Sequence, residues 1–301
     1  MKDNGFRGLL VDDSEKSRVI LTGIPYDKNA SIGKGASEAP SRIRELSRYF
    51  PPLTMDGADI SACKIFDRGD IVCEEEDCST YFRRIEKEVS STLRSDKLNL
   101  FIGGDHSVAI PLEKAFLEFA RKHGKKAGII HIDAHPDICD VYEGSSLSHA
   151  CPIRRAIDHG YEKSKLLLIG MRGYELQETA YFRQNPEIEV YPSSFILKNG
   201  VETVLQRIEE KFDDDDWIYL SYDIDANDPC FAPGTGTPEP FGLHSLDVLK
   251  IIRHIFRKQN VVAMDLVEIA PPLDKNDLTT WLGLKTLYEI FEILIDGRSQ
   301  R

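Results

Sequence analysis

Short apolar runs alternate with longer amphipathic segments along most of this chain of 301 residues. A short apolar run bounded by turn residues is typical of a buried strand, and apolar residues that recur every three or four positions are typical of a helix packed on one side. Their alternation predicts βα units around a mostly parallel sheet. Residues 98–101 and 261–264 are apolar on both faces, so we expect helices to sandwich the sheet.

The same pattern gives the expected elements and their limits. The expected strands are residues 18–23, 64–71, 98–103, 127–133, 166–171, 217–223 and 261–267. The expected helices are residues 107–122, 193–211, 244–258 and 277–294. Because neither an internal repeat nor a low-complexity linker interrupts the pattern, we expect a single α/β domain over residues 1–301. Residues 1–17 form an N-terminal extension, either an oligomer contact or a disordered terminus.

Charge and cysteine usage narrow the classes of partner and compartment. The chain has 50 acidic and 38 basic residues and a net charge of −12, which repels phosphate backbones and anionic lipids. We therefore expect neither nucleic acid nor a membrane as a partner. The first eleven residues lack the features of a signal peptide, and the six cysteines contain no CxxC pair, so we expect reduced thiols in the cytoplasm.

Three loops rich in carboxylates and histidines each follow an expected strand. They are GGDHS at 103–107, DAHPD at 133–137 and SYDIDANDP at 221–229. In the first loop the glycines permit a tight turn and Ser107 is expected to cap the following helix. In the other two, side chains two positions apart share a face. Open α/β sheets carry their chemistry at the carboxyl ends of strands. The candidate ligands there are His106, Asp133, His135, Asp137, Asp223 and Asp225.

Four carboxylates and two imidazoles are too many ligands for one metal ion that keeps open positions. Oxygen-rich ligation without thiolates favours Mn²⁺ or Mg²⁺ over structural zinc, and the imidazoles favour Mn²⁺. Two divalent ions would also balance four carboxylates, and a water shared by such a pair loses its proton near neutral pH. Calcium is a weaker alternative, because the spacing is not that of an EF-hand and histidine is a poor calcium ligand.

These motifs resemble those of the ureohydrolase family, the binuclear manganese enzymes that include arginase and agmatinase. The resemblance extends over nearly the whole chain, since segments 23–27, 35–40, 235–239 and 265–274 match as well as the three loops. It implies an arginase-like three-layer αβα fold and two Mn²⁺ per subunit. In that assignment one ion is held by His106 and Asp137, the other by His135 and Asp225, and both by Asp133 and Asp223.

The resemblance also implies the residues that act on the substrate. His149 would carry protons, with Asp225 or Asp137 as a relay, and Glu268 would anchor the guanidinium while a metal-bridging hydroxide attacks its carbon. The physical reading of Glu268 agrees, because a planar cationic fork needs a carboxylate partner and Glu268 directly follows an apolar strand.

The loop between Asp137 and His149 indicates which chemical group the substrate carries at the end opposite its guanidinium. Cys139 stands where arginases carry an asparagine that holds the amino-acid end of arginine, which argues against arginine as substrate. The loop contains Asp140 and Glu143 but neither Lys nor Arg, so it suits a tail that ends in ammonium. We therefore expect the protein to hydrolyse agmatine to putrescine and urea. The resemblance also implies a homo-oligomer, a trimer or hexamer as is common in the family, and the cysteine usage indicates the cytoplasm.

Two alternatives remain open at this stage. One is a hydrolase of the same fold that acts on another ω-guanidino compound or on guanidine, namely a guanidinobutyrase, a guanidinase or an arginase. The other is a non-catalytic metal-binding paralogue. The second is disfavoured because all six ligand positions, together with His149 and Glu268, are intact.

Overall fold

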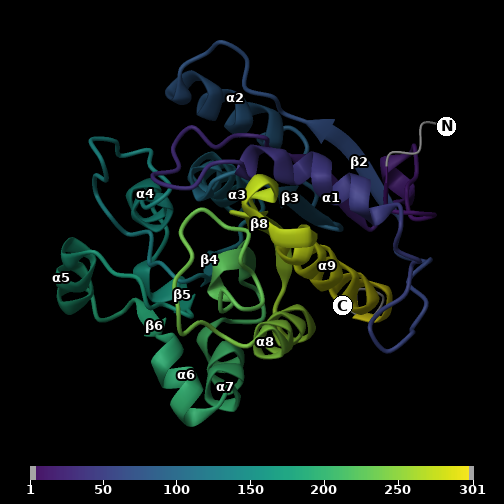
Figure 1. Cartoon of the computed structure of the whole chain (residues 1–301). Helices are drawn as coiled ribbons and strands as arrows, with labels where there is room; N and C mark the ends of the chain where they lie inside the picture. Colours follow the sequence, from purple (N-terminus) through teal and green to yellow (C-terminus); the bar gives the residue numbers. More distant parts are fainter. Residues whose placement is uncertain (1–4, 298–301) are drawn as a thin grey trace.

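A computed structural model of the chain describes residues 5–297 (Figure 1). The strands are β1 (Val19–Gly23), β2 (Ile65–Asp70), β3 (Leu98–Ile102), β4 (Ala127–Ile132), β5 (Leu166–Ile169), β6 (Glu189–Tyr191), β7 (Trp217–Asp223) and β8 (Val261–Val267). All pairs are parallel, and the order across the sheet is β2-β1-β3-β8-β7-β4-β5-β6. The seven expected strands are confirmed to within two residues at either end. Strand β6 was not expected, because three half-buried residues at an edge leave no apolar run.

The four expected helices are found, with two corrections. The helices are α1 (Ala39–Ser47), α2 (Cys78–Ser90), α3 (Ala109–Lys122), α4 (Pro152–His159), α5 (Leu176–Gln184), α6 (Ser193–Asn199), α7 (Glu202–Lys211), α8 (Ser245–Lys258) and α9 (Leu278–Gly297). Helices α1, α2, α4 and α5 were not among the expected elements. The single helix expected over 193–211 was wrong, because Gly200 at φ 81° ends α6 before α7 begins. The cap expected at Ser107 was also wrong: Asp105 accepts the Ser107 N–H at 3.0 Å ahead of a short 3₁₀ turn. Among residues 5–297 no helix is both long and apolar enough to cross a bilayer.

The helices cover both faces of the sheet, as the three-layer prediction requires (Figure 1). Helices α1, α6, α7, α8 and α9 pack into one core with strand residues such as Leu100. Helices α2, α3 and α4 pack into a second core with the next residue of the same strand, Phe101. Adjacent side chains of a strand point to opposite faces, so a strand buried on both sides is apolar throughout. A single domain with two apolar layers results.

The part of the N-terminal extension that the structure describes packs on its own chain. Phe6 and Leu9 are fully buried in the first core, and the Phe6 N–H donates to Ser47 Oγ at 2.6 Å. These two side chains therefore pack within their own chain rather than against another subunit. Residues 1–4 of the expected extension lie outside the described residues.

Glu113 on α3 gives a first testable prediction about stability. It is fully buried, and within the described chain neither carboxylate oxygen has a hydrogen-bond partner. Burial raises its pKa well above the usual 4.5, and the charge of Asp265 raises it further. A raised folded-state pKa means that titration of the Glu113 carboxyl favours the folded state at low pH. This contribution to the free energy of unfolding is complete below the unfolded-state pKa and is lost as pH rises toward the folded-state pKa.

We expect Glu113→Met to raise the free energy of unfolding at pH 8 by about 1–4 kcal/mol, since an apolar side chain replaces a buried unpaired acid. The gain should be smaller at pH 5. Urea unfolding at the two pH values measures it. Glu118→Met, on the partly exposed side of the same helix, is the control. An equal gain at both pH values, or a loss at pH 8, would contradict the prediction.

Candidate metal centre and substrate cavity

The candidate ligands meet at the carboxyl end of four neighbouring central strands. His106 follows β3, the DAHPD segment at 133–137 follows β4, Asp223 ends β7, and Glu268 follows β8. These four strands are adjacent in the order β3-β8-β7-β4. Parallel strands end at the same edge, so residues far apart in sequence are brought together there.

His106 lies at the centre of a first cluster. Its Nδ1 is 2.9 Å from Asp133 Oδ2, 3.0 Å from Asp137 Oδ2 and 3.1 Å from Asp223 Oδ2. All four side chains are buried. The opposite ring nitrogen, Nε2, is 2.8 Å from Ser221 Oγ, a contact that fixes the orientation of the imidazole.

His135 forms a second cluster that shares Asp133 with the first. Its Nδ1 is 3.1 Å from Asp225 Oδ2 and 3.5 Å from Asp133 Oδ1. Asp225 in turn donates its backbone N–H to Asp223 Oδ1 at 2.8 Å. The two carboxylate oxygens of Asp133 therefore face different imidazoles, and the six predicted ligands form one continuous group. Two sets of side chains that could hold a metal ion, with Asp133 in both, are found in this group.

The charges of this group are compatible with resident cations. Burial raises the pKa of Asp223 well above its usual value, and the carboxylates of Asp225 and Asp133 raise it further. Three buried atoms, His106 Nδ1, Asp133 Oδ2 and Asp225 Oδ2, lie close to other polar atoms, but within the described chain none of these contacts has the geometry of a hydrogen bond. Buried carboxylates are costly unless they are paired or coordinate a metal. The donor set contains oxygen and imidazole nitrogen but no thiolate, so it fits Mn²⁺ or Mg²⁺.

His131 belongs to the first cluster although it was not among the predicted ligands. Its Nε2 is 3.1 Å from Asp133 Oδ2, and its ring stacks on that of His106 with centroids 5.0 Å apart. It precedes Asp133 by two residues and therefore shares its face of β4. The alternation that selected the DAHPD side chains would have selected His131 too.

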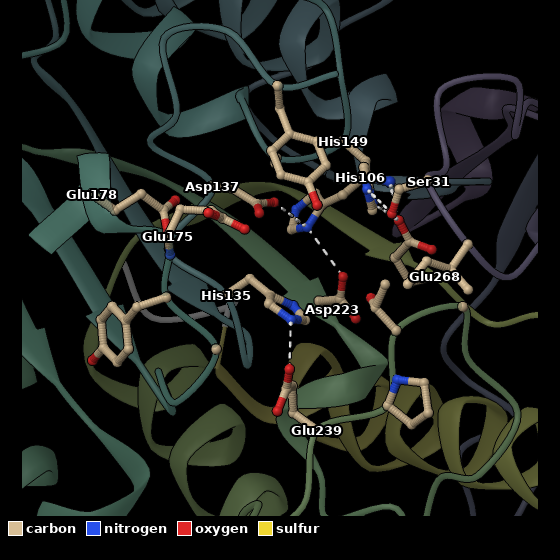
Figure 2. Close-up of a pocket in the computed structure, with 18 residues that line it drawn as sticks. Ser31, His106, His135, Asp137, His149, Glu175, Glu178, Asp223, Glu239 and Glu268 are labelled. Carbon is tan, nitrogen blue, oxygen red and sulfur yellow. Dashed lines mark hydrogen bonds and ion pairs between the residues drawn. The ribbon is translucent and has the colours of Figure 1, made fainter.

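His149 and Glu268 lie together beside the first cluster (Figure 2). His149 Nδ1 is 3.4 Å from Glu268 Oε1, and the same oxygen accepts the His106 backbone N–H at 2.8 Å. Burial lowers the pKa of His149, but the hydrogen bond and charge of Glu268 outweigh it and raise that pKa to about 9. Glu268 and Asp137 have positive φ angles of 62° and 51°. Non-glycine residues in this region are strained, and such strain is concentrated at functional sites.

A cavity of about 330 Å³ opens beside the two clusters, and its lining is acidic. Of the 18 described residues that line it none is Lys or Arg, whereas six are carboxylic acids (Figure 2). Tyr142 and Tyr174 contribute aromatic rings. The six acids are Asp137, Glu175, Glu178, Asp223, Glu239 and Glu268.

The two acids predicted to face the substrate from the loop after β4 lie elsewhere. Asp140 pairs with Arg155 at 2.7 Å, and Glu143 is exposed; neither lines the cavity. The segment after β5 instead supplies Glu175, just before α5, and Glu178 in the first turn of α5, and the loop after β7 supplies Glu239. The sequence analysis assigned none of these three a role toward the substrate, although Glu239 ends the matching segment 235–239, because their approach depends on how the loops pack.

Comparisons with known proteins agree with this geometry. A family model described as the arginase family matches residues 17–292. A guanidinobutyrase of Pseudomonas aeruginosa is 32% identical over 91% of this chain and 85% of its own length, and an agmatinase of Bacillus cereus is 35% identical over 92% and 91%. The crystal structure of an agmatine ureohydrolase of Thermoplasma volcanium superposes with a TM-score of 0.85, at 28% identity, over 97% of this chain and 94% of that one.

Proposed function

Since this chain belongs to the arginase family, as an agmatinase-like hydrolase of guanidino carbon–nitrogen bonds, we propose that its substrate is agmatine and its products are putrescine and urea. Agmatine carries a guanidinium at one end of an alkyl chain and an ammonium at the other. The observation that carries the proposal is the cavity lined by six carboxylic acids and by neither Lys nor Arg among its 18 described residues. The sequence resemblance further leads us to propose a cytoplasmic homo-oligomer that supplies putrescine.

The acidic lining discriminates between possible substrate tails. A tail ending in carboxylate would bring an anion close to Glu175 and Glu239 with no Lys or Arg in the described lining to pair with, and like charges in such contact cost several kcal/mol. Arg172 lies three residues before Glu175 in the sequence, but it does not line the cavity. Its guanidinium donates to the backbone oxygens of Asp225 and Glu239. An ammonium tail would instead find carboxylates to pair with at Glu175 and Glu239. The second candidate, 4-guanidinobutyrate, is favoured by the similarity to a guanidinobutyrase.

We propose two Mn²⁺ as the resident cofactor. His106 and Asp137 would hold one ion, His135 and Asp225 the other, and Asp133 and Asp223 would contact both. A pair of divalent cations supplies a nucleophile at neutral pH by lowering the pKa of a bound water. Support comes from the converging carboxylates and imidazoles, whose close contacts include three buried atoms without hydrogen-bond geometry.

The chain's own residues would bind and orient the substrate. Glu268, fixed by the His106 N–H, would accept the guanidinium N–H groups and place their carbon beside the metal centre. His149 lines the cavity with its Nδ1 toward Glu268 Oε1, and its imidazole would carry a proton to the departing amine. The largely enclosed position of both groups strengthens these charge interactions.

A urea-release assay on Mn²⁺-loaded protein tests the proposal with agmatine, arginine, 4-guanidinobutyrate and guanidine in parallel. We expect agmatine to give the highest kcat/KM. Urea from 4-guanidinobutyrate or arginine but not from agmatine would overturn the proposed substrate. No urea from any of the four would favour the non-catalytic alternative.

Matched variants test which acid faces the substrate tail. We expect Glu175→Arg to lower kcat/KM for agmatine by about 10-fold or more, because a like charge then meets the ammonium, and to raise the relative rate with 4-guanidinobutyrate. Glu143→Arg makes the same change outside the cavity and should leave this ratio near that of the wild type. The reverse pattern would move the tail site to the loop after β4.

A further inference from the structure

We propose that Ser31 is a positioning residue that holds the His149 imidazole in place for proton transfer. The inference rests on the proposed function, because it takes His149 as the proton carrier. Ser31 Oγ is 3.0 Å from His149 Nε2, while Glu268 Oε1 faces Nδ1 on the other side of the ring at 3.4 Å (Figure 2). Both ring nitrogens are therefore in contact with fixed polar groups.

The loop after β1 is fastened so that Ser31 reaches this position. The Asn29 N–H donates to Asp105 Oδ2 at 2.9 Å, and Asn29 Nδ2 donates to the Leu147 backbone oxygen at 2.7 Å. Asp105 is buried next to His106, and Leu147 precedes His149 by two residues. Ser31 follows Asn29 by the same two residues. Asn29 thus connects the loops after β1, β3 and β4 by hydrogen bonds. The contact between Ser31 and His149 lies two residues farther along the first and the last of these loops.

A hydroxyl group suits this position because it can both donate and accept. Neutral imidazole needs a donor at its unprotonated nitrogen, and imidazolium needs an acceptor at the same atom. By rotating its O–H bond, Ser31 can satisfy Nε2 in either state, so the ring need not reorient when it gains or loses a proton. The His149 side chain is only 12% exposed, which leaves little water to replace the hydroxyl.

Ser31 also lines the cavity, so a direct contact with the substrate is the competing explanation. The two differ in what happens once His149 is gone. A residue that acts through His149 has no effect in its absence, whereas a residue that binds the substrate keeps its effect. Non-additivity in a double-mutant cycle therefore separates them.

The experiment measures urea release by Mn²⁺-loaded wild type, Ser31→Ala, Ser31→Thr, His149→Asn and the Ser31→Ala/His149→Asn double variant. The substrate is whichever guanidino compound the wild type hydrolyses. General acid–base groups contribute about 10²–10⁴-fold, and we expect Ser31→Ala to lose about 10-fold of this in kcat with little change in KM. Ser31→Thr, which keeps the hydroxyl, should recover most of it. In the His149→Asn background Ser31→Ala should change kcat by less than about 2-fold.

Metal content and thermal unfolding of each variant should match those of the wild type. Ser41→Ala, on the exposed side of α1, is the matched control and should leave kcat unchanged. A Ser31→Ala enzyme with wild-type kcat would overturn the inference. So would an equal loss in both His149 backgrounds, or a loss confined to KM. A wild type that releases no urea from any guanidino compound would instead overturn the proposed function.

Discussion

Asp223→Asn is expected to abolish urea release and to leave the protein with fewer than two bound divalent ions. Asp223 Oδ2 is 3.1 Å from His106 Nδ1, and Asp223 Oδ1 accepts the Asp225 N–H, so the side chain lies between the two clusters. Loss of a group that only supports a ligand typically costs 10–100-fold in metal affinity or activity, so loss of a ligand should cost more than about 100-fold. Elemental analysis and the urea assay measure the two effects.

In the metal-free protein, Asp223→Asn should not lower thermal stability, although it lowers metal binding and activity. Because the folded-state pKa of Asp223 is raised, its contribution to stability is present at low pH and is lost as pH rises. Metal-free Asp223→Asn should therefore melt at or above the temperature of the metal-free wild type at pH 8, whereas Mn²⁺ should raise the Tm of the wild type more than that of the variant.

Asp215→Asn, the same change on the exposed acidic run before β7, is the control and should alter neither metal content nor Tm. The site assignment fails if Asp223→Asn retains two ions per chain. It also fails if Mn²⁺ protects the variant from heat as well as it protects the wild type.

Glu268→Gln is expected to give the second large effect. Glu268 is 2% exposed and is the carboxylate closest to His149, so the substitution removes a buried charge while it keeps the shape. Removing one partner of a buried charge pair costs about 2–5 kcal/mol, which corresponds to about 30-fold to 4,000-fold in kcat/KM for a guanidinium substrate. Steady-state kinetics of urea release at saturating Mn²⁺ provide the measurement.

A second readout identifies the cause of that loss. Because Glu268 raises the pKa of His149, Glu268→Gln should lower this pKa and shift the corresponding limb of the pH–kcat profile toward acid. Metal content should stay near that of the wild type. A variant whose kcat/KM remains within about 3-fold of the wild type would remove Glu268 from the role of guanidinium anchor.

Much of the clustering of the candidate metal ligands could be predicted, because these residues directly follow apolar strands. A strand that is apolar on both faces and then continues into Asp133, His135 and Asp137 gives both the place and the direction of the side chains. His131 carried the same signal, two residues earlier on the same face. The convergence of these strand ends needed only the expectation of a parallel sheet.

The outer part of the cavity could not be predicted in this way. Ser31, Glu175 and Glu239 lie on loops after β1, β5 and β7, and no local pattern distinguishes Ser31 and Glu175 from solvated loop residues. Glu239 lies in a segment that matches the family, but the match alone did not show that its side chain faces the cavity. Asp140 was a plausible candidate from its position in the chain, but Arg155 on α4 pairs with it. Which loop acids face the cavity depends on how the loops pack, and that information is not contained in spacing.

The place of β8 in the sheet has a consequence for how the protein is made. Strands β1 to β3 form one side and β4 to β7 the other, and β8 pairs with β3 and β7 between them. This last strand to be synthesised joins His106 to Asp223 and Asp133 across the sheet. A nascent chain that ends before residue 261 therefore lacks the strand with which both β3 and β7 pair. If the proposed pair of ions is bound, its binding should accordingly require that translation has passed β8.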